Sequence, residues 1–507
     1  MKKIRKILIA NRGEIAVRIM RTCRDLGIGT VAVYSEADRT ALHVQLADEA
    51  YFIGPSPSIE SYLIIDKIID VAKKSKTDAI HPGYGFLSEK APFSQACKDA
   101  RIIFLGPDPD SIRKMGDKIE ARKVALEAKV PMVPGIQRPL KDIAEAKQLA
   151  KEMKYPVLLK ASAGGGGKGM RIVEKESEIE SAFDRATSEA KKAFNDGSLY
   201  IEKYLKKARH IEVQMICDQH GNRLHLFERD CSLQRRHQKI VEEAPFGLIK
   251  PETREAMMKS CLRLCEKVNY TGVGTIEFLM DDDQNFYFLE MNTRLQVEHP
   301  VTEMITGLDL VALQIAIGEG KPLPIKQADV KIHGAAVECR LYAEDSDNNF
   351  MPSPGTIQWI NLPEGPGVRH DTGVYEGATI PIFYDPMIAK LITWGENREQ
   401  ALARMTRALR EYEIGGFKNN ISFLRTIIEH PEFVKGNTYT RFIDDHPELF
   451  EKRKIEFPQE WIFGLAAYDQ MKSQKNIGTG RDNPRIVPTE SSPWKILGLR
   501  EALGKRF

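Results

Sequence analysis

The chain has 507 residues, which is enough for about three domains of the usual size. Lysine and arginine together number 74 and aspartate and glutamate 71, so the net charge of +3 is small for this length. This balance gives no argument for nucleic-acid or membrane binding, and local basic clusters are therefore interpreted as site chemistry.

Cysteine usage and hydropathy indicate a soluble, cytoplasmic protein. The seven cysteines are scattered, without a C-x-x-C pair or the spacing of a disulfide framework, which favours a reducing compartment. The basic start of the chain leads into an apolar run that is too short for a signal peptide. The most apolar window, Leu308 to Gly318, is interrupted by Asp309 and Gln314 and is shorter than the roughly 18 residues of a membrane span.

Short apolar strands alternate with amphipathic helices over residues 1–115. The predicted strands are Ile7–Ala10, Thr30–Tyr34, Ala79–Ile80 and Ile102–Leu105. A helix from Glu14 to Leu26 is expected to bury Ile15, Ile19, Cys23 and Leu26, which recur at spacings of three and four. The pattern predicts a parallel, doubly wound α/β domain. No G-x-G-x-x-G follows the first strand, so nothing indicates a dinucleotide clasp.

The loop HPGYGF at 81–86 follows a strand end, where open α/β sheets bind ligands, although plain turn chemistry explains it equally well. From Lys118 the pattern changes to α+β: a helix is expected through Ala128, and a strand at 156–160 ends in Lys160. The following segment, ASAGGGGKGM at 161–170, exposes backbone N–H groups on four consecutive glycines, which suits a flap over phosphates. Its spacing is not that of a Walker loop, and a flexible linker is the alternative.

Two further segments extend this picture of a nucleotide site. The strand YIEKYL at 200–205 suits a hinge that offers backbone groups to an adenine edge. The run ERDCSLQRRHQK at 228–239 follows a strand at 224–227 and is densely charged; a solvated face is the ordinary interpretation. Because the run lies between the glycine flap and a carboxylate pair, we interpret it as groups that stabilise a transferring phosphoryl group.

Two carboxylates and an amide stand at the ends of short apolar runs. They are Glu277 in GTIEF, and Glu290 and Asn292 in EMNTRLQVEHP. Oxygen ligands of this kind suit a hard divalent cation beside nucleotide phosphates. Arg294, Gln296 and Glu298 follow at alternate positions and share one face in an extended segment. We therefore expect one strand to carry both metal and substrate groups.

Over about residues 1–450 the chain resembles the biotin carboxylase component of biotin-dependent carboxylases, an ATP-grasp enzyme found in acetyl-CoA, acyl-CoA and pyruvate carboxylases. The motifs that carry the resemblance are HPGYGFLSE at 81–89, KASAGGGGKGM at 160–170, EKYL at 202–205, ERDCSLQRRHQK at 228–239, GTIEF at 274–278, EMNTRLQVEHPVTE at 290–303, ECRLYAED at 338–345 and YDPMIAKL at 384–391. Most families with the ATP-grasp fold lack the arginine-rich run and RLQVEH together, so the match is specific.

The resemblance implies an α/β and α+β multidomain fold. Its parts are an N-terminal doubly wound, pre-ATP-grasp domain at 1–115, an ATP-grasp domain at 116–330 with a mobile glycine-rich lid at about 132–204, a C-terminal biotin carboxylase domain at 331–450 and an extension at 451–507. The catalytic site is expected between the domains.

The resemblance also assigns residues to ligands. ATP would be held by Lys118, Lys160, Gly166, Gly167, Glu202, Lys203, Tyr204, Leu205, His210, Gln234 and His237, with Glu277 and Glu290 at its phosphates. Magnesium or manganese would be held by Glu277, Glu290 and Asn292. Bicarbonate would lie against Lys239, Arg294, Gln296, Val297 and Glu298, and biotin against Tyr84 and Arg340.

Four of these residues would be catalytic: Arg294, Glu298, Lys239 and Arg340. In the implied reaction Glu298 removes the proton of bicarbonate, which attacks the γ-phosphate of ATP to give carboxyphosphate. Carboxyphosphate decomposes to carbon dioxide and phosphate, phosphate takes the proton from biotin N1′, and Arg340 stabilises the enolate. Bicarbonate is a poor nucleophile, so metal ions and cationic side chains are needed to spread the phosphoryl charge.

Partners are expected outside the chain. The extension carries no Met-Lys-Met acceptor for biotin, so the biotin carboxyl carrier protein or domain and the carboxyltransferase would act in trans. Segments 491–494 and 497–500 look like the start of the bridging region of acyl-CoA carboxylase α subunits, so the extension is expected to dock a partner, with disordered excess as the alternative. Ala163 stands where many relatives extend the glycine run. A homodimer is expected by analogy alone.

The final carboxyl acceptor is left open; an acetyl-CoA carboxylase of fatty acid biosynthesis is one of the expected assemblies. Two alternative functions are compatible with parts of the sequence. Another ATP-grasp carboxylate-amine ligase would share the lysines, the flap and the metal carboxylates, but it has no use for RLQVEH or Arg340. A non-catalytic ATP-binding scaffold of a carboxylase complex is favoured only where base or metal ligands are missing, and none is missing here.

Overall fold

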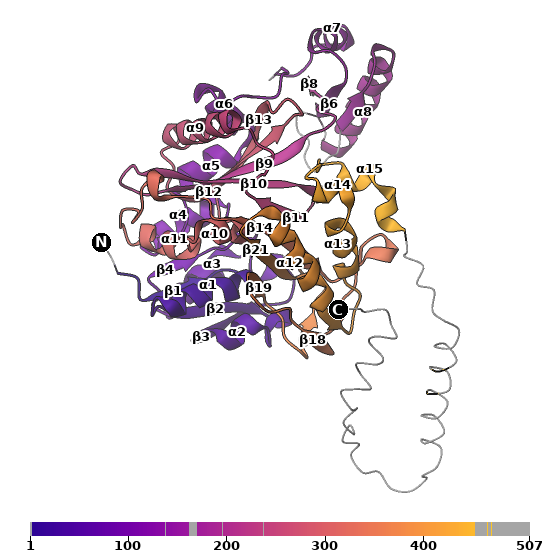
Figure 1. Ribbon diagram of the computed structural model, residues 1–507. Helices are drawn as coiled ribbons and strands as arrows, with labels where there is room; N and C mark the ends of the chain where they lie inside the picture. Colours follow the sequence, from indigo (N-terminus) through magenta and orange to yellow (C-terminus); the bar gives the residue numbers. More distant parts are fainter. Residues whose placement is uncertain are drawn as a thin grey trace.

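The computed structural model describes residues 3–136, 138–161, 170–194, 196–236 and 238–451, together with residues 464 and 468. Gly166, Gly167 and His237 of the predicted ATP site lie outside these residues, as does nearly all of the extension. Figure 1 shows the N-terminal part of the chain on one side of a large central sheet, the C-terminal helices beside that sheet and a small lobe at the top.

The N-terminal domain is a five-stranded parallel sheet in the order β3-β2-β1-β4-β5. Its elements are β1 (Lys6–Ile9), α1 (Gly13–Asp25), β2 (Gly29–Ser35), α2 (Leu42–Leu46), β3 (Glu49–Gly54), α3 (Ile65–Lys74), β4 (Ala79–His81), α4 (Ala91–Asp99), β5 (Ile103–Phe104) and α5 (Pro109–Gly116). Alternate residues of β1 enter two hydrophobic clusters: Ile7 and Ile9 pack with α1, whereas Leu8 packs with α3 and α4. Helices therefore cover both faces, which confirms the predicted doubly wound domain.

One position of the predicted helix is wrong. Ile15, Ile19 and Cys23 are buried, as their spacing predicts, but Leu26 is 49% exposed. Helix α1 ends at Asp25 and Leu26 is its C-cap, so the last position of the apolar stripe falls where the chain has left the helix.

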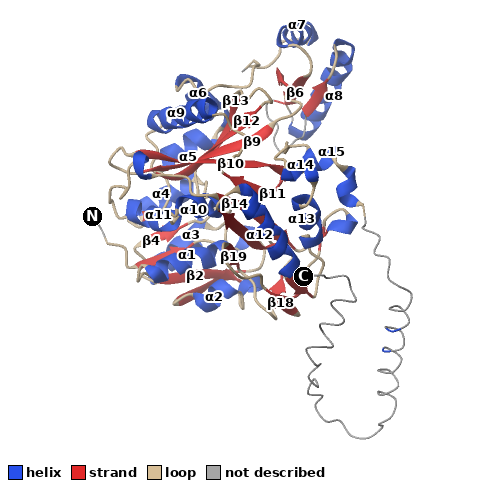
Figure 2. Ribbon diagram, in the orientation of Figure 1, coloured by secondary structure: helices blue, strands red, loops and turns tan. Residues whose placement is uncertain are grey.

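An eight-stranded antiparallel sheet in the order β13-β12-β9-β10-β11-β14-β21-β19 is the centre of the molecule (Figure 2). The elements of its first part are α6 (Lys118–Glu127), β9 (Arg209–Cys217), β10 (Arg223–Arg235), β11 (Gln238–Ala244), α9 (Pro251–Lys267), β12 (Gly272–Met280), β13 (Phe286–Asn292), α10 (His299–Thr306) and α11 (Leu310–Gly318). Strand β11 pairs with β14 of the C-terminal segment, so the second and third predicted domains share this sheet.

The densely charged run at 228–239 belongs to the sheet. Strand β10 extends as far as Arg235, and β11 begins at Gln238. Glu228 and Arg229 are fully buried, so the solvated-face interpretation is wrong for this part of the run. Arg229 is held by Glu212 and by the side chains of Gln214 and Thr302, which offset the cost of burying its charge.

The residues of the predicted lid form a lobe with its own core, at the top of Figure 1. The lobe contains α7 (Ile143–Met153), β6 (Val157–Ala161), β7 (Met170–Val173), α8 (Ile179–Phe194) and β8 (Leu199–Lys203). Its three strands have the order β7-β6-β8 and are separate from the central sheet. A unit with a separate core can move as one body; its mobility remains a prediction.

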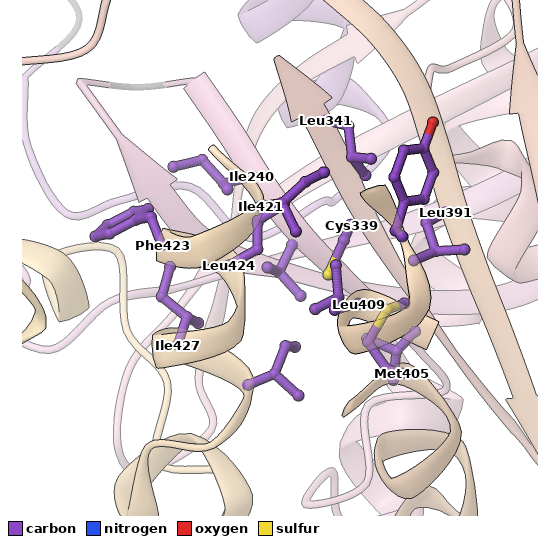
Figure 3. Close-up of a cluster of buried hydrophobic side chains, with 14 of the residues drawn as sticks. Ile240, Cys339, Leu341, Leu391, Met405, Leu409, Ile421, Phe423, Leu424 and Ile427 are labelled. Carbon is purple, nitrogen blue, oxygen red and sulfur yellow. The ribbon is translucent and has the colours of Figure 1, made fainter. Parts of the chain in front are cut away.

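The C-terminal segment adds strands and helices to the free side of the sheet. Its elements are β14 (Ala335–Tyr342), β15 (Glu344–Asp345), β16 (Met351–Pro352), β17 (Gly355–Thr356), β18 (Trp359–Asn361), β19 (Val368–Thr372), β20 (Thr379–Ile380), β21 (Met387–Gly395), α12 (Arg398–Glu411), β22 (Glu413–Gly415), α13 (Ile421–Ile428), α14 (Pro431–Val434) and α15 (Phe442–Asp445). Cys339 and Leu391 of the sheet pack against Met405 of α12 and Leu424 of α13 (Figure 3). This core fixes β14, and with it Arg340, against the rest of the sheet.

Among the described residues, no single helix is both long and apolar enough to cross a membrane. The most apolar window of the sequence corresponds to α11, which satisfies the criteria only as a pair with α10, and the two helices meet at a bend of 95°. Most residues of both helices are buried inside the protein.

Candidate active site

Lys239 of β11 lies at the centre of the site and is surrounded by carboxylates. Its Nζ atom is 2.6 Å from Glu212 Oε2, 3.0 Å from Glu277 Oε1 and 2.6 Å from Glu298 Oε1. Burial lowers the pKa of Lys239, but the three carboxylates raise it more, and the resulting pKa lies well above the usual value. The site therefore contains a permanent cation at the meeting point of strands β9, β11 and β12 and the start of α10.

Glu298 bridges two cations. It is the N-cap residue of α10 and is fully buried. Its Oε1 atom faces Lys239, and its Oε2 atom accepts a hydrogen bond from Arg340 at 2.9 Å. Burial raises the pKa of Glu298, but Lys239 and Arg340 lower it more, and the carboxyl stays well below its usual pKa. Arg340 in turn donates through Nε to Glu242 Oε1 at 2.6 Å, which fixes its direction.

The predicted metal ligands lie together at one edge of the sheet. Glu277 and Glu290 are register partners on β12 and β13, and Asn292 Nδ2 donates to Glu277 Oε1 at 2.9 Å. Desolvation and then the negative charge of Glu277 raise the pKa of Glu290. Two facing carboxylates with a carboxamide side chain beside them fit a divalent cation, because the cation would relieve the repulsion between the two carboxylates.

Two of the predicted nucleotide residues join this edge. His210 Nε2 lies 2.9 Å from Glu277 Oε2, and His210 Nδ1 lies 2.8 Å from the amide nitrogen of Gln234. The Gln234 side chain thus orients the imidazole, whose Nε2 atom faces Glu277. Both side chains therefore hold the metal carboxylate in a fixed position.

The segment from Arg294 to Glu298 is a loop, so the prediction that one strand carries the metal and substrate groups is wrong. Strand β13 ends at Asn292, and the loop leads into α10, whose first turn contains Pro300. Proline at this position favours the start of a helix and not the continuation of a strand. The loop nevertheless keeps the groups together, because Arg294 donates to Gln296 Oε1 at 2.9 Å and to Asn292 Oδ1 at 3.0 Å.

The lid contributes a second set of predicted nucleotide residues. Lys160 Nζ lies 2.5 Å from Glu202 Oε2, and Arg122 of α6 lies 2.8 Å from Glu202 Oε1. The predicted hinge strand ends at Lys203, whose Nζ donates to the backbone oxygen of Lys154, and Tyr204 and Leu205 follow it as connecting chain. The Glu202 carboxylate of β8 thus holds the ammonium group of Lys160, on the neighbouring strand β6.

Lys118, the remaining predicted nucleotide residue on the described chain, begins α6, and its charge lowers the pKa of Glu290. It therefore faces the same edge of the sheet as the metal carboxylates.

A cavity of about 530 Å³ opens next to this cluster of charged side chains. It is lined by the predicted biotin residues Tyr84 and Arg340 and by the predicted bicarbonate residues Arg294 and Val297. The N-terminal and C-terminal domains both contribute to its wall, since Glu14 and Asp385 also line it. The structure thus brings together four predicted site residues from three segments that lie far apart in the sequence.

Four charged residues of the site were missed by sequence reasoning: Glu89, Arg122, Glu212 and Glu242. Glu89 closes the motif at 81–89, and its Oε2 atom receives Arg294 Nε at 2.9 Å. Glu212 is a fully buried acid in the otherwise mostly apolar strand β9. An ionisable residue in such a strand is a recognisable signal for a functional site, but it identifies neither the partner nor the role.

Three family models match the chain. The biotin carboxylase N-terminal domain matches residues 3–112, the ATP-binding domain of the carbamoyl-phosphate synthase L chain matches 117–326, and the biotin carboxylase C-terminal domain matches 338–445. Together they cover the three units that form the site.

Individual relatives agree with these models. Biotin carboxylase 1 of Bacillus subtilis is 52% identical over 444 residues, which cover 87% of this chain and 99% of that protein. The mitochondrial propionyl-CoA carboxylase alpha chain of Sus scrofa is 50% identical over 503 residues, which cover 98% of this chain and 69% of that protein. The biotin carboxylase domain of Hydrogenobacter thermophilus 2-oxoglutarate carboxylase, solved with MgADP, ADP and bicarbonate, has a TM-score of 0.82 and 47% identity and covers 90% of this chain and 100% of that one.

The fold and the site define an ATP-grasp ligase. The chain belongs to the biotin carboxylase family. Its reaction is the ATP- and bicarbonate-dependent carboxylation of biotin, the first half-reaction of a biotin-dependent carboxylase, as the sequence resemblance predicts.

Proposed function

We propose that Lys239, Glu298 and Arg340 are the catalytic centre of this reaction and that Arg294 completes it. The observation that carries the proposal is the position of Glu298, whose two oxygens face two different cations. One cation, Lys239, contacts the metal carboxylate Glu277, and the other, Arg340, lines the cavity. The base therefore lies between the place where phosphate is transferred and the place where biotin is carboxylated.

Bicarbonate would bind beside Lys239, Arg294, Gln296 and Val297. A carboxylate held by two cations is a weak base, and the low pKa of Glu298 reflects this. Bicarbonate is itself an anion and competes with Glu298 for the same cations, so its binding raises the basicity of Glu298 where a base is needed. This competition explains how a strongly paired carboxylate serves as the base.

The chemical steps follow from these positions. Glu298 accepts the proton of bicarbonate, and a bicarbonate oxygen attacks the γ-phosphorus of ATP while the bond to ADP breaks. The resulting carboxyphosphate separates into carbon dioxide and phosphate. Phosphate removes the N1′ proton of biotin, and the negative charge that develops on the ureido oxygen is stabilised by Arg340, whose guanidinium is always protonated. N1′ then attacks carbon dioxide to give carboxybiotin.

ATP and magnesium would occupy the edge of the sheet under the lid. Lys118, Lys160, His210, Gln234 and the chain from Glu202 to Leu205 would hold the nucleotide, and Glu277, Glu290 and Asn292 would hold the metal. A bound metal ion would neutralise negative charge on the phosphates of ATP. The relative solved with MgADP and bicarbonate supports this arrangement. Gly166, Gly167 and His237 are proposed as further nucleotide contacts on the resemblance alone.

Replacing Glu290 with glutamine is expected to weaken the binding of MgADP by at least about tenfold, because one of two facing carboxylates loses the charge that attracts the cation. Binding of metal-free ADP should change much less. Isothermal titration calorimetry with MgADP and with metal-free ADP measures both affinities. Asp281→Asn, on the loop between β12 and β13, is the matched acid-to-amide control. Equal weakening of both forms would show that Glu290 does not hold the metal.

The proposed function is tested by ADP release from the purified chain with ATP, magnesium and bicarbonate, with and without free biotin. We expect bicarbonate-dependent turnover that rises when biotin is added. ATP binding without such turnover would contradict the assignment of these residues as a complete catalytic centre. Repeating the assay with a purified biotinylated carrier domain as the substrate shows whether a carrier acts in trans.

The carboxyl acceptor and the partners are proposed from the relatives. Alignment with the propionyl-CoA carboxylase alpha chain covers 98% of this chain, whereas alignment with the Bacillus biotin carboxylase covers 87%, so the former includes most of the extension at 451–507. This favours an acyl-CoA carboxylase with a separate carboxyltransferase and a biotin carrier, and the extension as a docking segment. A homodimer and a cytoplasmic location are further proposals; the seven free, buried cysteines support a reducing compartment.

A further inference from the structure

Lys390, in the motif YDPMIAKL, has no part in the proposed reaction, yet its side chain is fully buried. It lies on β21, next to β14 in the central sheet. A buried ammonium group is costly unless it is paired and hydrogen-bonded, so its contacts indicate what the charge does.

The ammonium group of Lys390 reaches three residues that line the cavity. Its Nζ donates to the backbone oxygen of Val297 at 2.8 Å, lies 3.4 Å from Glu14 Oε2 and lies 5.8 Å from the centre of the Tyr84 ring. These residues belong to three separate segments: the start of α1, the loop after β4 and the loop before α10. A single buried cation therefore contacts three segments of the cavity wall.

The charges around Lys390 make it difficult to replace. The carboxyl oxygens of Glu14 and Glu338 are buried and have no hydrogen-bond partner among the described residues. Burial raises the pKa of Glu14 to about 7, and Lys390 is the strongest opposing influence there and at Glu338. Nearby Arg369 is already paired with Asp371 and Glu303.

The backbone is also tightly packed at this point. A Cβ atom on Gly373, in the chain after β19, would lie 2.5 Å from the backbone nitrogen of Glu14. Only glycine fits there, so the C-terminal and N-terminal domains approach one another closely beside the Glu14–Lys390 pair. A small displacement of either partner is therefore transmitted to the cavity wall and is not absorbed by a gap.

We propose that Lys390 is a positioning residue of the biotin cavity, which holds Glu14 and the Val297 carbonyl in place from behind the wall. It touches no substrate and acts through these residues. The inference rests on the proposed function of the cavity, since it assigns Lys390 to the biotin half of the reaction and not to the nucleotide half.

The test compares Lys390→Met, Glu14→Gln and the double variant with the wild-type chain. Lys390→Met keeps the length of the side chain and removes its charge, and we expect kcat/KM for biotin to fall by at least about tenfold while the affinity for MgADP stays within about twofold. Glu14→Gln is expected to show a smaller loss of the same kind. The double variant should be no worse than Lys390→Met, because the two residues act as one unit. Lys259→Met, which removes an exposed lysine of α9, is the control and should match the wild type.

Several outcomes would overturn the inference. If Lys390→Met is active and its kcat/KM for biotin is unchanged, the inference is wrong, whereas the proposed function is unaffected. Equal losses in MgADP affinity and in biotin turnover show a general defect and not a positioning role. Losses that simply add in the double variant show that Lys390 and Glu14 act independently, which contradicts the inference. A wild-type chain without bicarbonate-dependent turnover overturns the proposed function and this inference with it.

Discussion

Replacing Arg340 with methionine is expected to lower biotin-dependent turnover by about 10²–10³-fold, the usual effect of losing a preorganised donor to a developing oxyanion. Arg340 lines the cavity and contacts Glu242 and Glu298, neither of which is a proposed metal ligand. Nucleotide affinity should therefore change little, and so should the slow bicarbonate-dependent cleavage of ATP without biotin. Steady-state ADP release with and without biotin, together with titration of MgADP, measures each quantity.

A second variant separates catalysis from stability. Removing Arg340 leaves Glu242 and Glu298 buried without that partner, and breaking a buried pair costs about 3–5 kcal/mol of stability. The double variant Arg340→Met, Glu242→Gln removes one of the two unpaired charges and should recover part of that stability in urea unfolding. It should recover no biotin turnover. Recovery of turnover together with stability, or equal losses in turnover and nucleotide affinity, would show that Arg340 is structural.

Replacing Glu298 with glutamine is expected to lower the turnover by about 10²–10⁴-fold, the range for loss of a general base. In contrast to the Arg340 variant, this loss should appear in ATP cleavage with bicarbonate alone, because the base acts before carboxyphosphate forms. Glutamine has nearly the same size and keeps an oxygen for a hydrogen bond, so the cavity should retain its shape. Single-turnover measurement of ADP formation without biotin distinguishes the two variants, and normal ATP cleavage would contradict the role of Glu298.

The same variant has a predicted pH dependence in its stability. Lys239 and Arg340 hold the pKa of Glu298 below the value of about 4.3 for an unfolded glutamate, despite the opposing effect of burial. The ionised carboxylate therefore stabilises the folded chain fully above that value, and this stabilisation is lost as the pH falls through the folded pKa. Urea unfolding at neutral pH should show wild type to be more stable than Glu298→Gln, and the difference should shrink below about pH 4. A constant difference would mean that the charge of Glu298 contributes nothing.

The local sequence pattern predicted correctly those helices and strands whose own residues define them. The parallel strands, the helix after β1 and the strand before the glycine run follow from period and composition, and the structure has all of them. Pattern failed at element ends: Leu26 lies past the end of α1, and the chain after Asn292 turns into α10 in place of continuing β13. Caps and turns at such ends depend on one or two residues, which a repeating pattern does not report.

The burial and the partners of charged residues inside strands were also not predictable from the sequence. In sequence, Glu228 and Arg229 look like part of a solvated run, and Glu212 and Glu242 have no visible partner. In the structure all four are fully buried and each forms an ion pair with a residue of a neighbouring strand or helix. Burial of a charge requires such a partner, and the partner belongs to another part of the chain.

The sequence by itself determined the class of chemistry through a family resemblance that extends over most of the chain. It also predicted metal ligands at Glu277 and Glu290 and a base and a cation in the segment after them. Only the tertiary structure decided which groups meet. Lys239 contacts Glu298, which lies 59 positions away at the start of α10. Arg340 contacts Glu242 across 98 positions because β11 pairs with β14 in the central sheet. Strand order is set by the packing of the whole domain, and no local pattern encodes it. Pairing of β14 with β21, in which Lys390 is the register partner of Arg340, places Lys390 behind the cavity.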